Sequence, residues 1–501
     1  MIADQDMLKL QNGSDVRGVA LEGVAGEPVT LFPEAVNRIT SGFVDFMTQK
    51  TGKKPSELKI AVGHDSRVTA EPLKKEVLQA LTAAGVRAFD CGLASTPAMF
   101  MSIVFAYTKM DASIMLTASH LPYNRNGMKF FTIDGGLEKA EITRVLQLAC
   151  EEFPKAADIN RVPALALIDL YADHICRKIK DGINAEDYEH PLKGMHVVVD
   201  AGNGGGGFFA TKVLEVLGAD TSGSLYLNPD GMFPNHIPNP ENQTAMDAIK
   251  GAVLQNKADL GLIFDTDVDR MSAVLPNGEQ VSRNALIAMM AAILAPDYPG
   301  STIITDSVTS DELTAFLTGD LKLKHHRFKR GYKNVIDECI RLNKAGTVSP
   351  LAIETSGHGA LSENYYLDDG AYLAVKMLIA AAKAKREGKE LGLLIAGLGQ
   401  PAESKEYRLK IQTPDFKVYG QQVIDAFAAR AAEKGIKVAS PSYEGVRLVF
   451  PEGWALLRMS LHDPVMPLNV EGRHQGEVAA ILKIIRELVA GFEKLDLTAL
   501  V

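Results

Sequence analysis

The chain has 501 residues, a length that predicts about three or four domains because one hydrophobic core rarely serves so long a chain. Hydrophobic residues make up 46% and charged residues 23%, which is typical of a soluble globular protein. The net charge of −9 argues against a nucleic-acid-binding face, so any anionic ligand must be held by local positive charge.

The cysteines and the N-terminal residues indicate a cellular compartment. The four cysteines form no Cys-x-x-Cys pair and are interpreted as reduced core thiols of an intracellular protein. They are Cys91, Cys150, Cys176 and Cys339. The first residues, MIADQDMLKLQNG, lack the pattern of a signal peptide, and the longest uncharged apolar run, 285–295, is too short for a membrane span. We therefore expect a cytoplasmic protein that binds neither membrane nor nucleic acid; the oligomeric state stays open.

Short apolar runs alternate with amphipathic segments along most of the chain. Residues 58–67 predict a strand that runs into a loop, residues 70–85 a helix with a glycine at its end, and residues 86–92 the next strand. The same alternation recurs at 195–218, with a helix near 208–218, at 258–270, and at 301–318, with a helix near 311–318. This pattern predicts α/β layers with mostly parallel sheets, in which ligands gather at the carboxyl ends of the strands.

Breaks in the pattern predict four domains. The expected ranges are 1–190, 191–297, 298–403 and 404–501. The first three are expected to be α/β domains, and the last a smaller α+β domain. Its predicted strands are 405–411, 436–440, 445–450 and 453–459.

A polar loop, TASHLPYNRNGMKFF, contains the first candidate for chemistry. The dipeptide Asn126-Gly127 predicts a tight turn that directs Lys129 back toward Ser119 and its neighbour His120. One interpretation is an ordinary serine that caps a turn. A second is the nucleophile of a serine hydrolase, although no Gly-x-Ser-x-Gly elbow surrounds it. A third is a serine that carries a phosphoryl group.

A second loop, DTDVDR, follows the apolar run LGLIF and brings three alternating carboxylates, Asp265, Asp267 and Asp269, to one place. Such oxygen ligands suit Mg²⁺ or Ca²⁺. An EF-hand is excluded, because its sixth and twelfth positions would be Arg270 and Pro276 in place of Gly and Glu. The alternative is an acidic, solvated turn. With a phosphate-bearing serine and a cation such as Arg270, the carboxylates would form a phosphoryl-transfer site.

A third loop, ETSGHG, offers Glu354, Ser356 and His358 around a glycine turn. Carboxylates and hydroxyls of this kind can hold sugar hydroxyls, although a plain polar loop is equally compatible with the sequence. Upstream, KRGYKN places Lys333 after a glycine, as a candidate proton-transfer or phosphate-binding group.

Taken together, these loops resemble motifs of the α-D-phosphohexomutase superfamily. TASHLPYNRNGMK is similar to its phosphoserine loop, DTDVDR to its metal loop and ETSGH to its sugar loop. NGSDVRG at 12–18 matches its N-terminal motif only in Arg17, Gly18 and the apolar residue before them. The motifs occur in the family's order along the chain.

The resemblance implies an architecture and a set of roles. The fold would have three mixed α/β domains and a smaller α+β domain around a central cleft. The activity would be that of a phosphoglucomutase or phosphomannomutase, which converts a hexose 1-phosphate to a 6-phosphate through a 1,6-bisphosphate. The implied catalytic residues are Ser119, His120, Lys129, Lys333 and Arg17. The implied Mg²⁺ ligands are Ser119, Asp265, Asp267 and Asp269. The implied substrate-binding residues are Arg270, Glu354, Ser356, His358, Arg458, Ser460 and His462.

The sequence departs from the family where the last domain should hold the phosphate far from the serine. In RMSLHDPVMPLNVE, residues 458–471, the family's Gly-Thr pair has become Leu461-His462 and its second arginine has become Pro467. Leucine does not allow the close backbone approach that glycine does, and proline removes both a charge and an amide donor. A smaller departure is His64, which stands where the family usually has arginine.

This departure leaves three functions open. A mutase would require the altered loop to keep its grip, for instance through His462. A bisphosphate synthase would release the bisphosphate, and Ser119 would be recharged by another sugar bisphosphate. A sugar-phosphate sensor without turnover is disfavoured, because a sensor needs neither a phosphoryl carrier nor three metal carboxylates. The hexose itself cannot be identified from the sequence.

Overall fold

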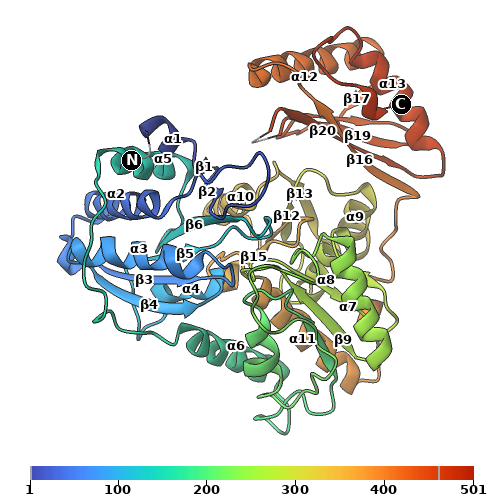
Figure 1. Cartoon of the computed structure of the whole chain (residues 1–501). Helices are drawn as coiled ribbons and strands as arrows, with labels where there is room; N and C mark the ends of the chain where they lie inside the picture. Colours follow the sequence, from blue (N-terminus) through green and yellow to red (C-terminus); the bar gives the residue numbers. More distant parts are fainter. Residues whose placement is uncertain (1–2, 461–462, 501) are drawn as a thin grey trace. The chain divides into compact units, whose positions relative to one another are not determined.

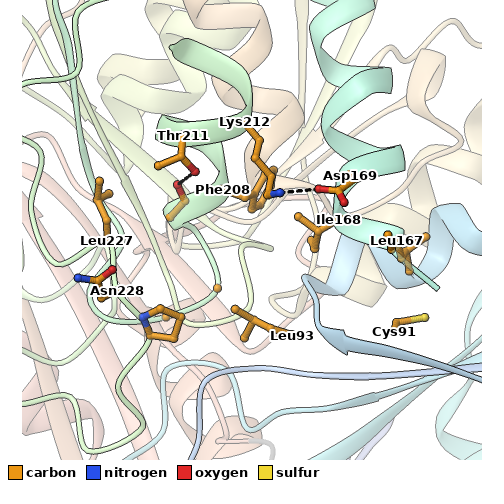
Figure 2. A pocket seen from close by; sticks show the side chains of 15 residues that line it. Cys91, Leu93, Leu167, Ile168, Asp169, Phe208, Thr211, Lys212, Leu227 and Asn228 are labelled. Atoms are coloured by element: carbon orange, nitrogen blue, oxygen red, sulfur yellow. Dashed lines mark hydrogen bonds and ion pairs between the residues drawn. The ribbon is translucent and has the colours of Figure 1, made fainter. Parts of the chain in front are cut away.

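The computed structural model describes residues 3–460 and 463–500 (Figure 1). The chain forms two compact units. Unit 1 contains Met1–Ile293 and Ser356–Leu394, and unit 2 contains Leu294–Thr355 and Ile395–Val501. Among the described residues, none of the helices combines the length and the apolar character that a membrane crossing would need.

Unit 1 begins with a seven-stranded mixed sheet in the order β1-β2-β6-β5-β3-β4, with β7 paired to β6. Its strands are β1 (Gln11–Asn12), β2 (Asp15–Val19), β3 (Lys59–His64), β4 (Arg87–Leu93), β5 (Ala112–Leu116), β6 (Arg125–Thr132) and β7 (Gly135–Gly136). Strand β3 runs parallel to β4 and β5, whereas β6 runs antiparallel to β2 and β5.

Helices cover both faces of this sheet. They are α1 (Asp4–Leu8), α2 (Pro33–Thr51), α3 (Ala70–Ala83), α4 (Thr96–Val104), α5 (Lys139–Glu151) and α6 (Leu167–Ile183), with a short 3₁₀ turn, η1 (Pro55–Glu57). Ile60 and Val62 of β3 join residues of α2, α3 and α5 in one hydrophobic core. The next residue, Gly63, faces α4 instead, and a Cβ there would lie 2.5 Å from the sulfur of Met99. Because alternate residues of a strand face opposite sides, β3 is buried on both.

The second sheet of unit 1 has the order β11-β10-β9-β8. Its strands are β8 (Val197–Asp200), β9 (Leu260–Phe264), β10 (Met271–Val274) and β11 (Gln280–Val281). Strands β8 and β9 are parallel, and the other two pairs are antiparallel. The remaining elements of this part are η2, a π-helix (Phe209–Leu214), α7 (Gln243–Asn256), α8 (Asn284–Leu294), β15 (Gly359–Leu361), η4 (Ser362–Asn364), α11 (Gly370–Arg386) and η5 (Leu391–Ile395).

Unit 2 contains the parallel strands β13, β12 and β14 and a five-stranded antiparallel sheet in the order β16-β20-β19-β18-β17. The strands are β12 (Thr302–Thr305), β13 (Lys324–Arg327), β14 (Leu351–Ile353), β16 (Glu403–Lys410), β17 (Lys437–Val438), β18 (Val446–Val449), β19 (Gly453–Leu457) and β20 (Val465–Gly472). The helices are α9 (Asp311–Ala315), η3, a π-helix (Phe316–Asp320), α10 (Tyr332–Lys344), α12 (Phe416–Glu433), α13 (Glu477–Leu488) and η6 (Thr498–Leu500). Helices α12 and α13 share one hydrophobic core with the antiparallel sheet.

Several predicted elements are confirmed, and some are wrong. The helix predicted at 70–85 is α3, and three of the four C-terminal strands match β16, β18 and β19 closely, while β17 is only two residues long. The prediction of mostly parallel sheets is wrong, because hairpin connections make β6 and β10 antiparallel. The helix predicted near 208–218 is the shorter π-helix η2, and that near 311–318 is α9 continued by the π-helix η3. The four domain boundaries stay a prediction.

The predicted turn at Asn126-Gly127 is also wrong, because both residues lie inside β6. A Cβ on Gly127 would lie 2.3 Å from the carbonyl oxygen of Val16 and 2.8 Å from that of Thr117. The glycine therefore serves the close approach of β2 and the serine loop to β6, and Lys129 reaches the loop as a strand residue.

Candidate active site

Ser119 lies just beyond the carboxyl end of β5, as the sequence predicts for a ligand-binding loop. Its side chain is buried, and its Oγ donates a 2.9 Å hydrogen bond to Oδ2 of Asp265. Nδ1 of His120 lies 3.3 Å from the same Oγ. The backbone of Ser119 is left-handed, with φ of 51°. A non-glycine residue held there costs of the order of 1–3 kcal/mol, so the surrounding structure must maintain it.

Two residues that sequence reasoning did not assign, Asp65 and Arg67, support this loop. They follow β3, and both are buried. Asp65 accepts a 2.7 Å hydrogen bond from Oγ1 of Thr117, and Arg67 donates to backbone carbonyls of the serine loop, including that of Ser119 at 2.5 Å. Their signal in the sequence was the polar segment HDSR at the carboxyl end of a predicted strand.

The carboxylates Asp265, Asp267 and Asp269 lie between β9 and β10, and all three are buried. One oxygen from each lies within 4.8 Å of the others, a spacing that can hold a metal ion. In the described part of the chain, Oδ1 of Asp267 and Oδ1 of Asp269 have no hydrogen-bond partner. Because a buried bare carboxylate oxygen is costly, these two atoms fit a site that holds a divalent cation. Val268 has φ of 67°, which is strained for a β-branched residue.

Lys129 on β6 reaches this carboxylate cluster, whereas the sequence predicted only that it is directed toward Ser119; its role in proton transfer stays a prediction. Its Nζ lies 2.9 Å from Oδ2 of Asp267 and 2.5 Å from Oδ2 of Asp269. Oγ1 of Thr96 donates a 2.5 Å hydrogen bond to Oδ2 of Asp267 as well. The ammonium group therefore offsets part of the negative charge at the two Oδ2 atoms and does not occupy the two Oδ1 atoms, of which that of Asp269 lies 3.6 Å from Nε2 of His358.

Burial dominates the ionisation of the site. Burial, with the nearby Asp269 and Asp267, raises the pKa of Asp265 well above its ordinary value. Burial acts against ionisation of Asp269 too, but Lys129 and Arg270 hold the pKa of Asp269 below its ordinary value. Burial, with Arg270 and Arg17, lowers the pKa of His120 to about 2. His120 is therefore a neutral imidazole beside the serine at physiological pH.

Arg270 and His358 form a second layer against the metal loop. Nε of Arg270 donates a 3.1 Å hydrogen bond to Nε2 of His358, whose Nδ1 lies 2.9 Å from Oγ of Ser356. Gly357 has φ of +94°, and a Cβ there would lie 2.7 Å from the carbonyl oxygen of Met271. Burial, with Arg270, lowers the pKa of His358 well below its ordinary value. Ser356 and His358 thus lie in unit 1 with the serine and metal loops, and their predicted role in substrate binding stays a prediction.

Arg17, predicted from the N-terminal motif, lies on β2. Its Nη2 pairs with Asp15 at 2.9 Å, and its Nη1 approaches the carbonyl oxygen of Ala118 at 3.5 Å. It therefore adds positive charge next to the residue that precedes Ser119.

In unit 2, the first half of the sugar loop supports the segment before α10. Oε1 of Glu354 accepts a 2.7 Å hydrogen bond from the backbone N–H of Gly331. Lys333 lies in the first turn of α10, where its Nζ pairs with Asp337 at 2.6 Å. Asp306 follows β12 and accepts a 2.7 Å hydrogen bond from Oγ1 of Thr355. The predicted roles of Glu354 and Lys333 in substrate binding and proton transfer stay predictions.

Arg458 is buried at the end of β19, and the structure adds a partner that the sequence did not indicate. Nη1 of Arg458 lies 3.6 Å from Oε1 of Glu444. Oε2 of Glu444 accepts hydrogen bonds from Oγ of Ser307 at 2.5 Å and from the N–H of Arg330 at 3.0 Å. The predicted residue His462 lies outside the described residues.

The strand after this loop was missed from the sequence. Strand β20 was interpreted as part of a phosphate-binding loop, yet it pairs with both β16 and β19. Pro467 is buried within it, opposite Arg408 of β16, and its carbonyl oxygen accepts the N–H of Arg458. Ser460 follows, and its N–H donates to the carbonyl oxygen of Val465 at 3.0 Å.

Comparisons with known proteins agree with this arrangement of loops. Residues 9–152, 169–278 and 282–398 match the models of phosphoglucomutase/phosphomannomutase alpha/beta/alpha domains I, II and III. These matches cover well over half of the chain. The chain belongs to the phosphoglucomutase/phosphomannomutase family. It is therefore an enzyme of the phosphohexomutase type.

Relatives and solved structures of this family resemble the whole chain. A phosphomannomutase/phosphoglucomutase of Pseudomonas putida is 29% identical over 432 residues, 86% of this chain and 87% of its own. A phosphoglucomutase of Neisseria gonorrhoeae is 27% identical over 425 residues, 84% of this chain and 86% of its own. The crystal structure of a phosphoglucomutase/phosphomannomutase family protein from Burkholderia thailandensis has a TM-score of 0.78 at 24% identity, with 98% of each chain covered. That likeness supports the mixed α/β fold with an additional C-terminal sheet.

Proposed function

We propose that this enzyme transfers a phosphoryl group on a hexose phosphate in a Mg²⁺-dependent reaction that uses a phosphoserine at Ser119. The observation that carries the proposal is the 2.9 Å hydrogen bond from Oγ of Ser119 to Asp265. In the same cluster of carboxylates, Oδ1 of Asp267 and Oδ1 of Asp269 are buried and have no hydrogen bond within the described residues. The names of the family's relatives, phosphomannomutase and phosphoglucomutase, support the same class of substrate.

The residues of the site would share the work of transfer. Asp265, Asp267 and Asp269 would hold a divalent cation, which supplies charge neutralisation for a phosphoryl group and a Lewis acid for the transfer. Lys129 supplies a further positive charge at the same carboxylates. The nearby Arg17 adds charge beside the serine loop. Catalysis then consists of positioning and of electrostatic stabilisation of an in-line transfer.

The reaction balances in two transfers. In the first, the bond between Oγ of Ser119 and phosphorus breaks, a sugar hydroxyl forms the new bond to phosphorus, and the hydroxyl proton passes to a base. This gives a sugar bisphosphate and a free serine hydroxyl. In the second, the bond between the other phosphorus and its sugar oxygen breaks, Oγ of Ser119 forms the new bond to that phosphorus, and the serine proton passes through a base to the sugar oxygen that is released. The net result is a hexose 1-phosphate converted to a 6-phosphate.

A second candidate, a glucose 1,6-bisphosphate synthase, is favoured by unit 2. Arg458 has part of its charge countered by the half-buried Glu444, and Pro467 is buried where the family's second arginine is expected. A weak grip on the remote phosphate would let the bisphosphate leave before it reorients. Ser119 would then be recharged by another sugar bisphosphate.

One experiment separates these functions. The enzyme is incubated with glucose 1-phosphate and Mg²⁺, with and without a sugar bisphosphate as donor, and the products are followed by phosphorus NMR. Accumulation of glucose 6-phosphate with a catalytic amount of bisphosphate supports the mutase. Accumulation of glucose 1,6-bisphosphate with stoichiometric loss of the donor supports the synthase. If neither product forms from glucose 1-phosphate or mannose 1-phosphate, and no phosphate is found on Ser119 by mass spectrometry, the proposal is wrong.

A further inference from the structure

Both backbone polar groups of Ser119 are held by buried side chains. Its N–H donates a 2.9 Å hydrogen bond to Oγ1 of Thr117, and its carbonyl oxygen accepts one from Nη2 of Arg67 at 2.5 Å. These two hydrogen bonds hold the peptide groups before and after the Cα of Ser119, whose φ is a left-handed 51°. They therefore act on the torsions that decide where Oγ points.

The guanidinium of Arg67 uses all of its N–H donors on this one loop and on Asp65. Nη2 donates to the carbonyl oxygens of Ser119 and Leu121, the latter at 2.7 Å. Nη1 donates to the carbonyl oxygens of Pro122 at 2.6 Å and Arg125 at 2.9 Å, and Nε donates to Asp65 at 3.2 Å. Five donors in a rigid plane match this set of acceptors, whereas the three donors of a lysine ammonium radiate from one atom.

The same set of hydrogen bonds closes on itself. Oδ2 of Asp65 accepts both Nε of Arg67 and Oγ1 of Thr117, while Oδ1 accepts the backbone N–H of Arg67. Thr117 in turn accepts the N–H of Ser119. Moving any one of these groups therefore changes the bonds on both sides of the serine. Arg67, Asp65, Thr117 and Ser119 form what we call the serine bracket.

Gly231 and Phe233, which come from the part of unit 1 that contains the second sheet, lie against Arg67 and its neighbours. The ring of Phe233 lies 5.3 Å from the guanidinium carbon of Arg67. A Cβ on Gly231 would lie 2.3 Å from the backbone nitrogen of Val68 and 2.5 Å from the carbonyl oxygen of Ser66. This close approach limits the room in which Arg67 could move. The guanidinium is thus fixed by its acceptors on one side and by packing on the other.

We propose that Arg67 is a positioning residue, which keeps Ser119 left-handed so that Oγ stays directed at the carboxylate cluster whether or not it carries a phosphoryl group. This inference rests on the proposed function of Ser119. It differs from a role in general stability, because four of the five N–H bonds of the guanidinium end on residues 119–125, the fifth ends on the Asp65 that completes the bracket, and none ends on the hydrophobic core.

The test compares Arg67→Lys with a matched variant, Arg38→Lys. Arg38 is another buried arginine of unit 1, and it donates to the carbonyl oxygens of Ala149 at 3.1 Å and Cys150 at 3.0 Å, away from the serine. We expect kcat of Arg67→Lys to fall by about 100-fold, since a displacement of 1 Å at a reacting atom can have that effect, with KM changed less than about threefold. Arg38→Lys should keep kcat within about threefold at a temperature at which both variants are folded.

A smaller change, Thr117→Val, guards against a variant that does not fold. It removes one hydroxyl of the bracket, and we expect kcat to fall by about tenfold at constant KM. When Arg67→Lys and Thr117→Val are combined, the loss of kcat, expressed as a free energy, should be smaller than the sum of the two single losses, because both changes act on the same torsions of Ser119. Guanidinium ion at low millimolar concentration should restore activity to Arg67→Ala by about tenfold, whereas methylammonium should not.

The outcomes separate this inference from the proposed function. If Ser119→Ala keeps native activity, the proposed function fails and the inference with it. If Ser119→Ala is inactive while folded Arg67→Lys and Thr117→Val keep kcat within threefold of Arg38→Lys, only the positioning role of Arg67 fails. Equal losses of kcat in Arg67→Lys and Arg38→Lys would overturn it too, because they would indicate a general effect on stability.

Discussion

The charged side chains around Ser119 in unit 1 and those around Arg458 in unit 2 differ in the partners that they have. Around Ser119, Oδ1 of Asp267 and Oδ1 of Asp269 have no hydrogen bond among the described residues, and Nε2 of His358 lies 3.6 Å from the second of these atoms. Around Arg458, part of the charge is countered, since Glu444 lies 3.6 Å away and is itself held by two further donors, although Nε of Arg458 has no hydrogen-bond partner among the described residues. A cation can therefore bind the aspartates directly, whereas an anion that binds Arg458 would compete with Glu444 for the guanidinium.

This difference bears on the order of events in the proposed reaction. Transfer depends on the serine and metal loops, which are complete. Reorientation of a bisphosphate would require a second phosphate-binding group, and in the proposed scheme the pair of Arg458 and Glu444 would weaken it. The contrast between the two regions is therefore also a contrast between the two candidate functions.

The largest effect should come from removal of the serine hydroxyl. Ser119→Ala should lower kcat by about 10⁴-fold or more for either function, because the phosphoryl carrier is lost. Ser113→Ala is a matched control, since the hydroxyl of Ser113 is buried on β5 with no hydrogen-bond partner among the described residues. Its kcat should stay within about twofold. Steady-state kinetics with a hexose 1-phosphate, together with intact-mass analysis of Ser119, measures both.

The next effect concerns the bare carboxylate oxygens. Asp267→Asn should raise the Mg²⁺ concentration needed for half-maximal activity by at least about tenfold, because an amide is a weaker ligand for a hard cation than a carboxylate. Chelation of the metal should abolish turnover of the unchanged enzyme, and Mg²⁺ should restore it. Because Mg²⁺ should bind only the folded state, it should also raise the melting temperature of the enzyme, and it should raise that of Asp267→Asn by less. Equal melting shifts in both proteins would place the cation elsewhere.

An intermediate effect should appear in unit 2. Glu444→Gln keeps an oxygen that can accept from Ser307 but removes the charge opposite Arg458. A phosphate should then bind Arg458 about tenfold more tightly, which corresponds to about 1.4 kcal/mol and is modest for a charge-assisted contact. The ratio of hexose 6-phosphate formed to bisphosphate released should rise in proportion to this gain in phosphate affinity. Glu452→Gln, an exposed glutamate of the same sheet domain, should leave the ratio unchanged.

How far the sequence predicted the site follows from the kind of signal each residue gives. Asp265, Asp267 and Asp269 were identified because three carboxylates after an apolar strand are rarely grouped without a ligand. Asp65 and Arg67 were not assigned, because their partners lie in a loop about fifty residues away: Asp65 accepts from the hydroxyl of Thr117, and Arg67 donates to backbone carbonyls, which leave no mark on the sequence. Glu444 was not assigned for a similar reason, because its partners come from three segments that are distant in the sequence.

The errors in the fold have a similar origin. Asn126-Gly127 is a strong turn signal, but β6 uses the glycine for close contact with the carbonyl oxygens of Val16 and Thr117. Strand β20 was missed because a proline and several polar residues lower its strand propensity. Its pairing with both β16 and β19 outweighs that local preference.

The last effect concerns the stability of unit 2 and not catalysis, and it acts through Glu471 on β20. Burial raises the pKa of Glu471 to about 7, although Ser404 and Trp454 both donate hydrogen bonds to it. The folded state therefore holds a proton that the unfolded chain, with a pKa near 4.5, has already lost. Because the folded state binds more protons in this interval, the free energy of unfolding of unit 2 should fall as pH rises from about 4.5 to about 7, by up to about 3 kcal/mol, and level off above.

Glu471→Gln should remove this dependence while it keeps an acceptor for the indole N–H of Trp454. The variant should be more stable than the unchanged enzyme at pH 8 and similar to it at pH 4.5, and exposed Glu433→Gln should retain the slope. Trp454 is the single tryptophan of the chain and is buried in unit 2, so its fluorescence during urea unfolding reports on that unit. A urea midpoint that falls equally with pH in Glu471→Gln would show that the proton is held by another group, and the self-paired charges around Arg458 would be the next place to look.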